Sequence, residues 1–197
     1  MPRISEPRPP AEPSTSGQLE RQARLLRAAA HLGAAKGLDG VQMAEVAQEA
    51  GVALGTVYRY YPSKHHLFAA LLAGRVSGQA APPVTGDAVA DVVELVTTAC
   101  RAMLRRPLLA HAMITSVNVV RACSGARGDA TFRDQIVRAA GIEEPSYDDL
   151  QLARLVEQCA YGVLTWAVAG ESTAEEAEAD LRRACALLLV PWSTSTQ

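Results

Sequence analysis

Residues 42–68, QMAEVAQEAGVALGTVYRYYPSKHHLF, predict two short helices joined by a tight turn. The first helix has apolar residues at the three- and four-residue spacing of a buried face: Met43, Val46, Ala47 and Ala50. Gly51 stops this helix, because glycine adopts a positive φ without steric cost. The second helix begins at Leu54 and reaches about Tyr60, and Pro62 then ends the hydrogen-bond ladder.

The second helix carries polar side chains that suit contact with DNA. Thr56, Arg59 and Tyr60 are expected to point outward from it, while Val57 and Tyr61 point inward. Two helices in this arrangement form a helix-turn-helix, whose second helix lies in the major groove of DNA. Two short helices around a glycine also occur in proteins that do not bind DNA, so the spacing alone leaves the function open.

The string GTVYRYYPSKHHL, residues 55–67, closely resembles the recognition helix and following cap of the TetR family of dimeric bacterial repressors. The longer pattern VQM…VA…VA.GT.YRYYPSK.HL is similar to the actinobacterial sterol-catabolism repressors of that family, the KstR type. The resemblance is strong from about Gln18 to Leu72, and beyond that it rests on RRPLLAHAM, VLTWAVAG and the order of helices. It implies a three-helix helix-turn-helix head and a larger helical body that binds a ligand and dimerises.

Three residues are candidates for reading bases. Arg59 is the one side chain of the second helix that can form a bidentate contact to guanine in the major groove. Leu54 can press on a thymine methyl group, and Gln42 can reach an adenine edge or a phosphate. We expect Tyr58 to pack across the head, and the alternative is that its hydroxyl group reaches the DNA backbone.

The resemblance to TetR proteins implies further contacts with the DNA backbone. It implies that Thr56 and Tyr60 bind phosphates through their hydroxyl groups, and that Lys64 binds a phosphate at the start of the next helix. Backbone N–H groups at a helix start also favour anions. The sequence departs from the family pattern at Ala53 and Ala44, where serine and arginine are frequent, and both changes remove contacts with phosphates.

The composition agrees with close-packed helices. The 197 residues are 49% hydrophobic with only two phenylalanines and two tryptophans, and no segment has the alternation of a half-buried strand. No apolar run approaches the roughly 20 residues needed to cross a bilayer, and the N-terminus lacks the apolar core of a signal peptide. We therefore expect an all-α protein in the cytoplasm with no membrane partner.

Charge and cysteine spacing add two observations. Residues 1–79 hold nine Lys/Arg and six Asp/Glu, a balance of +3, whereas residues 80–197 hold ten and fifteen, a balance of −5. A DNA-binding half is expected to be the more basic one. The cysteine spacings of 23, 36 and 26 residues fit no zinc or redox motif. We interpret all four cysteines as small core residues: Cys100, Cys123, Cys159 and Cys185.

The chain divides into three parts. Residues 1–17 contain five prolines and no apolar periodicity, which predicts a disordered arm. Residues 18–66 are the predicted helix-turn-helix DNA-binding domain, and residues 67–197 the predicted ligand-binding and dimerisation domain. The turn-forming segment 78–87, GQAAPPVTGD, separates the head from the helices downstream. The other expected helices cover 19–36, 64–77, 88–105, 108–122, 129–140, 147–169 and 174–190.

The last two long helices carry apolar stripes that suit a dimer interface: Leu152, Val156, Cys159, Val163 and Ala167 on the first, and Leu181, Ala184, Cys185 and Leu188 on the second. Small residues such as Ala153, Ala160 and Gly162 allow a second helix to approach closely. The resemblance implies that two subunits pair these helices in a four-helix bundle. A dimer can place two recognition helices one DNA turn apart, about 34 Å, on a palindromic site. A monomer can use the same stripes for its own core, so the residues alone leave this choice open.

A ligand pocket is expected inside the body. Its candidate wall residues are Met103, Leu104, Met113, Val117, Val120, Leu164 and Trp166. An ordinary hydrophobic core predicts the same residues. The KstR-type resemblance implies a sterol-derived acyl-CoA thioester as effector, whose phosphates would meet Arg101, Arg105, Arg106 and Arg121.

The sequence therefore predicts a homodimeric transcriptional repressor that leaves a palindromic operator when a hydrophobic or acyl-CoA effector binds. Nothing in it resembles a catalytic loop or a metal-binding motif, so we expect no enzyme activity, no cofactor and no metal. Two alternatives remain open: a DNA-binding regulator that responds to no ligand, and a helical protein that binds small molecules without a role on DNA.

Overall fold

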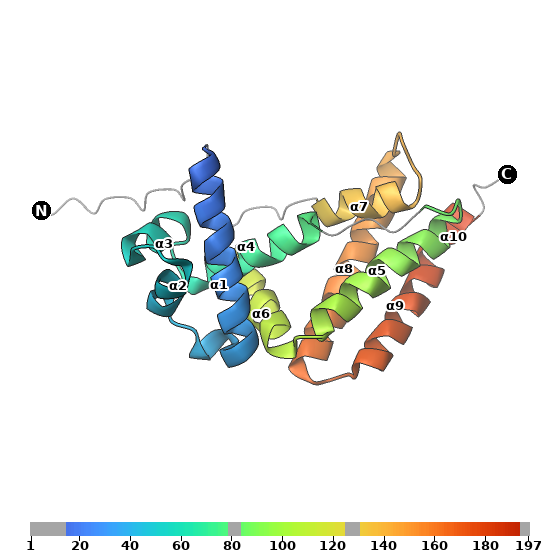
Figure 1. Cartoon of the computed structure of the whole chain (residues 1–197). Coiled ribbons are helices and arrows are strands. Elements are labelled where there is room, and N and C mark those ends of the chain that lie inside the picture. The colour runs from blue at the N-terminus through green and yellow to red at the C-terminus, as the bar shows by residue number, and fades with distance from the viewer. Residues whose placement is uncertain (1–14, 79–83, 125–130, 194–197) are drawn as a thin grey trace, which may run out of the picture.

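The computed structural model describes residues 15–78, 84–124 and 131–193, and within these ranges it contains ten helices and no strand (Figure 1). The predicted all-α fold is confirmed. The helices are α1 (Ser16–Gly40), α2 (Met43–Ala50), α3 (Leu54–Tyr60), α4 (Lys64–Ser77), α5 (Ala88–Leu104), α6 (Pro107–Ser124), α7 (Thr131–Ala139), α8 (Tyr147–Ala169), α9 (Ala174–Leu188) and α10 (Val190–Ser193). No helix in these ranges is both long and apolar enough to span a bilayer.

Figure 1 shows an elongated molecule with α1–α4 at one end and α5, α8 and α9 at the other. Helix α6 lies beside α1 and α4, and α7 lies over α8. Residues 1–14 of the predicted arm and residues 79–83 of the predicted boundary segment lie outside the described ranges.

Local capping sets the ends of α1. Thr15 Oγ1 accepts a hydrogen bond from Gln18 N at 3.3 Å, and Gln18 Oε1 accepts one from Thr15 N at 3.2 Å. This capping box starts the helix at Ser16, before the expected residue 19. Gly37 has φ of +68° and interrupts the helix where a stop was expected, but one further turn continues to Gly40.

The first hydrophobic core joins the head to part of the body. It contains the buried faces of α1–α4 together with the first half of α6, where Leu109, Met113 and Ile114 are at most 2% exposed. Gly33 in α1 permits this packing, because a Cβ there would lie 2.6 Å from Phe68 Cε1 and 2.9 Å from Leu109 Cδ1. The head is therefore attached to the body through α6 as well as through α4.

The second core lies among α5, α7, α8, α9 and α10. Residues of the stripes predicted on the last two long helices face this core, and Val156, Leu181 and Cys185 are buried in it. Trp192 in α10 closes the end of the body, since its Nε1 donates a hydrogen bond to Asp149 Oδ1 at 2.7 Å. The stripes thus serve, at least in part, the core of a single subunit.

The start of α8 is fixed by reciprocal hydrogen bonds between Ser146 and Asp149. Ser146 N donates to Asp149 Oδ2 at 2.9 Å, and Asp149 N donates to Ser146 Oγ at 3.2 Å. The hydrogen bond from the Ser146 hydroxyl lowers the pKa of Asp149, and the Trp192 indole lowers it further. The ionised carboxylate therefore holds both the first turn of α8 and the end of the described chain.

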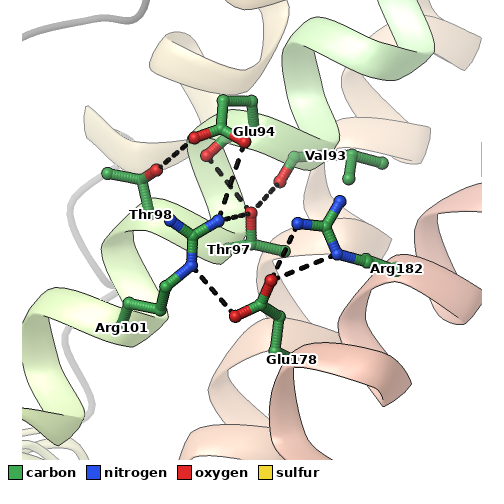
Figure 2. A network of polar contacts seen from close by, with 7 residues as sticks. All are labelled: Val93, Glu94, Thr97, Thr98, Arg101, Glu178 and Arg182. Atoms are coloured by element: carbon green, nitrogen blue, oxygen red, sulfur yellow. Dashed lines mark hydrogen bonds and ion pairs between the residues drawn. The ribbon is translucent and has the colours of Figure 1, made fainter. Parts of the chain in front are cut away.

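A surface network of polar side chains joins α5 to α9, as Figure 2 shows. Arg101 Nε donates to Glu178 Oε2 at 2.9 Å, and Arg182 Nη2 donates to Glu178 Oε1 at 2.8 Å. Arg101 Nη2 also donates to Thr97 Oγ1 at 3.3 Å. Exposed ion pairs of this kind contribute little to the free energy of folding, so their main effect here is to hold Arg101 in place.

Two of the four cysteines are core residues. Cys100 and Cys185 are each 2% exposed, and burial raises the pKa of each thiol to about 11. Cys123 is exposed near the end of α6 and Cys159 is half-buried on α8, so the interpretation of all four as core residues is wrong for these two. Their apolar neighbours in sequence do not determine which side of the helix meets another element.

Candidate DNA-binding surface and ligand cavity

The turn between α2 and α3 follows from its residues. Gly51 adopts the left-handed conformation expected of it, with φ of 64° and ψ of 44°, and its N–H bonds to Gln48 O at 3.2 Å. Ala53 precedes α3 and supplies no side-chain cap, as its departure from serine implies. Helix α3 covers Leu54–Tyr60 as predicted.

Helix α3 presents an exposed face made of Leu54, Tyr58 and Arg59, of which Leu54 is 41% and Tyr58 49% exposed. Its other face is buried, with Val57 at 0% and Tyr60 at 7%. Residues three or four apart share a helix face, so Val57 and Tyr60 lie together and Leu54 and Tyr58 lie together. The expectation that Tyr60 points outward while Tyr58 packs across the head is therefore wrong.

Three further predicted DNA contacts lie on or beside these helices. Gln42 is exposed immediately before α2, and Thr56 is half-buried on α3. Lys64 starts α4, and its Nζ donates a hydrogen bond to Leu38 O at 3.0 Å, which ties α4 to the end of α1. An ammonium group has three N–H donors, so Lys64 can donate to a phosphate in addition to Leu38 O. The roles of these residues on DNA remain predictions.

One polar contact between the head and the body could not be predicted from the sequence. His65 Nδ1 on α4 lies 3.3 Å from Ser116 Oγ on α6, and Ser116 is fully buried. The two residues are 51 positions apart, so periodicity within either helix does not predict their meeting. This contact adds a specific polar attachment to the apolar packing of α6 on α4.

A cavity of about 750 Å³ lies between α4, α5, α6, α7 and α8. Four of the seven predicted wall residues line it: Met103, Val117, Val120 and Leu164. Small and branched side chains of α4 and α5 extend this apolar wall: Ala69, Leu72, Ala73, Val76, Ala99 and Ala102. A volume in this range is typical of a site for an organic ligand.

The other three predicted wall residues lie elsewhere. Met113 is buried in the core that α6 shares with the head, and Leu104 packs against the second core. Trp166 is 64% exposed on the outside of α8. Their placement in the wall is therefore wrong, because apolar spacing identifies helix faces without identifying what each face meets.

Charged side chains also line the cavity, and four of the five are cationic: Arg75, Arg121, Arg133, Arg154 and Glu157. Arg133 Nε pairs with Glu157 Oε2 at 3.2 Å. Burial lowers the pKa of Arg75, and the nearby positive charge of Arg106 lowers it further.

Tyr161 fixes one of these cations. The Arg121 guanidinium lies 4.9 Å above the centre of the Tyr161 ring. The Tyr161 hydroxyl donates to Ile114 O at 3.2 Å and lies 3.0 Å from Asn118 Oδ1. Of the four arginines that the sequence suggested for coenzyme A, only Arg121 lines the cavity, and Arg101 is held by Glu178 instead.

The outer sides of α8 and α9 carry large apolar residues in contact with solvent. Leu155 and Trp166 on α8 are 38% and 64% exposed, and Leu187 on α9 is 61% exposed. A Cβ at Gly162 would meet no atom within 4 Å, so this part of α8 is open to an approaching helix.

These features together define a helix-turn-helix DNA-binding regulator with a helical body that contains a ligand-sized cavity. Residues 25–71 match the family model described as bacterial regulatory proteins, tetR family, and residues 86–188 match the tetracyclin repressor-like C-terminal domain. The chain belongs to the TetR family.

Curated relatives place it more closely within that family. It is 35% identical over 149 residues to the HTH-type transcriptional repressor KstR of Rhodococcus jostii, covering 73% of this chain and 70% of that one. Against KstR of Mycobacterium tuberculosis the identity is 33% over 155 residues, with 74% and 70% covered. The predicted resemblance to the KstR type is thus confirmed.

Solved structures share the fold. A TetR transcriptional regulator from Rhodococcus sp. RHA1 superposes with a TM-score of 0.81 at 42% identity, covering 88% of this chain and 97% of that one. FadR of Thermus thermophilus, a TetR-family repressor solved in complex with lauroyl-CoA, superposes with a TM-score of 0.59 at 17% identity, covering 85% and 93%.

Proposed function

We propose that this protein is a homodimeric repressor that leaves a palindromic operator when a hydrophobic or acyl-CoA effector enters the cavity between α4 and α8. The observation that carries this proposal is that α4 belongs to both sites. Its first turn follows the recognition helix directly, and its later residues Ala69 to Val76 contribute to the cavity wall. A ligand that displaces α4 therefore acts on the element that holds the head.

On DNA, Arg59 reads a guanine, Leu54 contacts a thymine methyl and Gln42 reaches a base edge or a phosphate. Thr56 and Lys64 bind phosphates. Tyr60 is buried, whereas Tyr58 is the tyrosine exposed beside Arg59. The burial of Tyr60 therefore supports a smaller role in DNA contact for Tyr60 than the sequence resemblance implies. Tyr60 then contributes by packing α3 against the head, with at most its hydroxyl directed to a phosphate.

Two subunits associate through the outer sides of α8 and α9. The exposed Trp166 and Leu187 and the open surface at Gly162 support this assignment, since large apolar side chains in solvent indicate an interaction surface. A dimer of this kind carries two α3 helices, which agrees with an operator of two half-sites about 34 Å apart.

The effector is an amphiphile. Most of the cavity wall is apolar, whereas its charged residues are mainly arginines, a combination that suits an apolar body with an anionic group. The KstR relatives support a sterol-derived acyl-CoA, and control of sterol or lipid catabolism follows as the regulated process. To release DNA, this effector must bind the DNA-incompetent state more tightly than the DNA-bound state.

Selection of genomic fragments by the purified protein at physiological salt tests the function directly. A recovered short palindrome beside lipid- or sterol-degradation genes supports the proposal, and release of that fragment by an acyl-CoA completes it. Broad binding without a shared sequence, unaffected by any acyl-CoA, indicates a ligand-independent DNA-binding protein instead. No DNA binding at any salt concentration contradicts the repressor assignment.

A further inference from the structure

The charges in the cavity wall are unbalanced on the side formed by α4. The pair between Arg133 and Glu157 neutralises one of the four arginines. Among the residues that the structure describes, Arg75, Arg121 and Arg154 form no ion pair with a carboxylate. Arg121 is held over the Tyr161 ring, and Arg154 is exposed. Of the four arginines in the cavity wall, Arg75 alone is half-buried with no aromatic or acidic partner among the described residues.

Arg75 is half-buried, so its charge is only partly hydrated. A cation removed from water loses hydration that only an anion or a set of acceptors restores. Burial lowers the pKa of Arg75, and the positive charge of Arg106 lowers it further. The next residue, Val76, has its carbonyl oxygen occupied by Gln135 Nε2 at 2.7 Å, and this bond fixes the end of α4 against α7. An anion that enters the cavity compensates for the lost hydration.

Arg75 also lies on the element that carries the head. It is in the last turn of α4, and the same helix buries Phe68 against Gly33 of α1 and hydrogen-bonds to Leu38 through Lys64. A displacement of Arg75 is thus transmitted to the head along a single helix, α4. By contrast, Arg154 is on α8, which makes no comparable contact with α1, α2 or α3.

We propose that Arg75 binds the anionic group of the effector and makes negative charge, in addition to apolar bulk, the signal that moves α4. This inference rests on the proposed function, because it requires an effector in the cavity. The ligand class is an amphiphile with an apolar body against the alanine-rich wall of α4 and α5 and a carboxylate or phosphate at Arg75. An uncharged apolar molecule of equal size occupies the cavity without releasing DNA.

The test compares Arg75→Gln with Arg154→Gln, which removes a cavity charge from α8 instead. Operator release is followed by fluorescence anisotropy, and probe binding is measured separately by calorimetry. The probes are lauroyl-CoA, laurate and dodecanol, which share one chain length and differ in the anionic group. Operator affinity without probe serves as the folding control, since Arg75 is outside the predicted DNA-binding residues.

For Arg75→Gln, we expect the concentration of anionic probe at half-release to rise about ten-fold or more, and release at saturating probe to be incomplete. Arg154→Gln is expected to weaken probe binding while keeping full release at saturation. Laurate and lauroyl-CoA responses distinguish a carboxylate from a phosphate at Arg75: the variant weakens the response to whichever probe supplies that group.

Two results overturn the assignment while leaving the proposed function intact. In the first, Arg75→Gln matches the wild-type protein both in the concentration of anionic probe at half-release and in the maximal release. The other is release of the wild-type protein by dodecanol as effectively as by the anionic probes. A wild-type protein that binds its operator and is released neither by these probes nor by a sterol-derived acyl-CoA contradicts the effector-responsive function itself, and with it the role of Arg75.

Discussion

Replacing Gly33 by alanine tests whether α1, α4 and α6 are packed as closely as the structure indicates. Alanine in a helix interior is ordinarily better than glycine by about 1 kcal/mol. At Gly33, however, the new Cβ would lie 2.6 Å from Phe68 Cε1 and 2.9 Å from Leu109 Cδ1, whereas carbon atoms normally pack at about 3.5–4.0 Å. Phe68 and Leu109 are both fully buried, so neither has solvent to move into.

The expected change in the free energy of unfolding follows from these two effects. Overpacking a rigid core costs about 1–3 kcal/mol, which cancels or exceeds the helix-propensity gain. The matched control is Gly74→Ala in α4, where the new Cβ meets only Leu26 Cδ1 at 4.0 Å. We expect Gly33→Ala to be less stable than Gly74→Ala by about 1–3 kcal/mol in the free energy of unfolding. For a chain of this size each kcal/mol corresponds to about 2–4 °C in melting temperature.

Thermal and urea denaturation of the two variants measure this difference, and operator affinity in the same samples reports the head. Because Gly33 lies where the head meets α6, we expect its substitution to weaken DNA binding as well, whereas Gly74→Ala keeps it. A Gly33→Ala protein as stable as the Gly74→Ala control, with unchanged operator affinity, refutes the close packing of α4 and α6 on α1.

Four further predictions address the other sites. Arg59→Ala is expected to weaken a specific operator by about 1–3 kcal/mol and to relax one base preference in a binding-site selection; unchanged affinity removes Arg59 from base reading. Val117→Trp fills part of the cavity and is expected to abolish effector-driven release while operator binding persists, and retained release removes Val117 from the effector site. Trp166→Glu places a charge on the outer side of α8 and is expected to shift the dimer to monomer in analytical ultracentrifugation; an unchanged dimer places the interface elsewhere. Ser146→Ala is expected to cost about 1 kcal/mol at pH 7. Because the folded pKa of Asp149 is lowered, its stabilisation is present above pH of about 4 and is lost as the pH falls through the folded value, so the loss caused by Ser146→Ala should shrink in acid.

The sequence determines the helices here better than it determines their faces. Gly51 and Pro62 set the ends of α2 and α3 by their backbone geometry, which depends on the local residues and can be predicted from the sequence. The three tyrosines at 58, 60 and 61 are chemically identical, and α3 has only seven residues, so the pattern is too short to fix which of them is buried. The structure resolves this by packing Tyr60 inside and leaving Tyr58 in solvent.

The cavity was predictable only in part for a related reason. Val117 and Leu164 are apolar and helical, and so are Met113 and Trp166, yet the four meet different surroundings: two at the cavity, one in the core and one in solvent. No apolar pattern in the sequence marks Arg75 as a cavity residue. An arginine near a helix end is ordinarily exposed to solvent. Contacts between distant residues, such as that of Arg101 with Glu178, decide these cases, and a single sequence does not display them.

The sharing of one core by α1, α4 and α6 affects how this protein can be recombined with others. A chimera that joins its first 78 residues to a foreign body would expose Phe68 and lose the partners supplied by Leu109 and Met113. The transferable unit is therefore discontinuous: the amino-terminal helices together with the beginning of α6, two segments separated along the chain by α5. Engineers who wish to exchange operator specificity would do better to graft the exposed residues of α3 than to exchange the whole head.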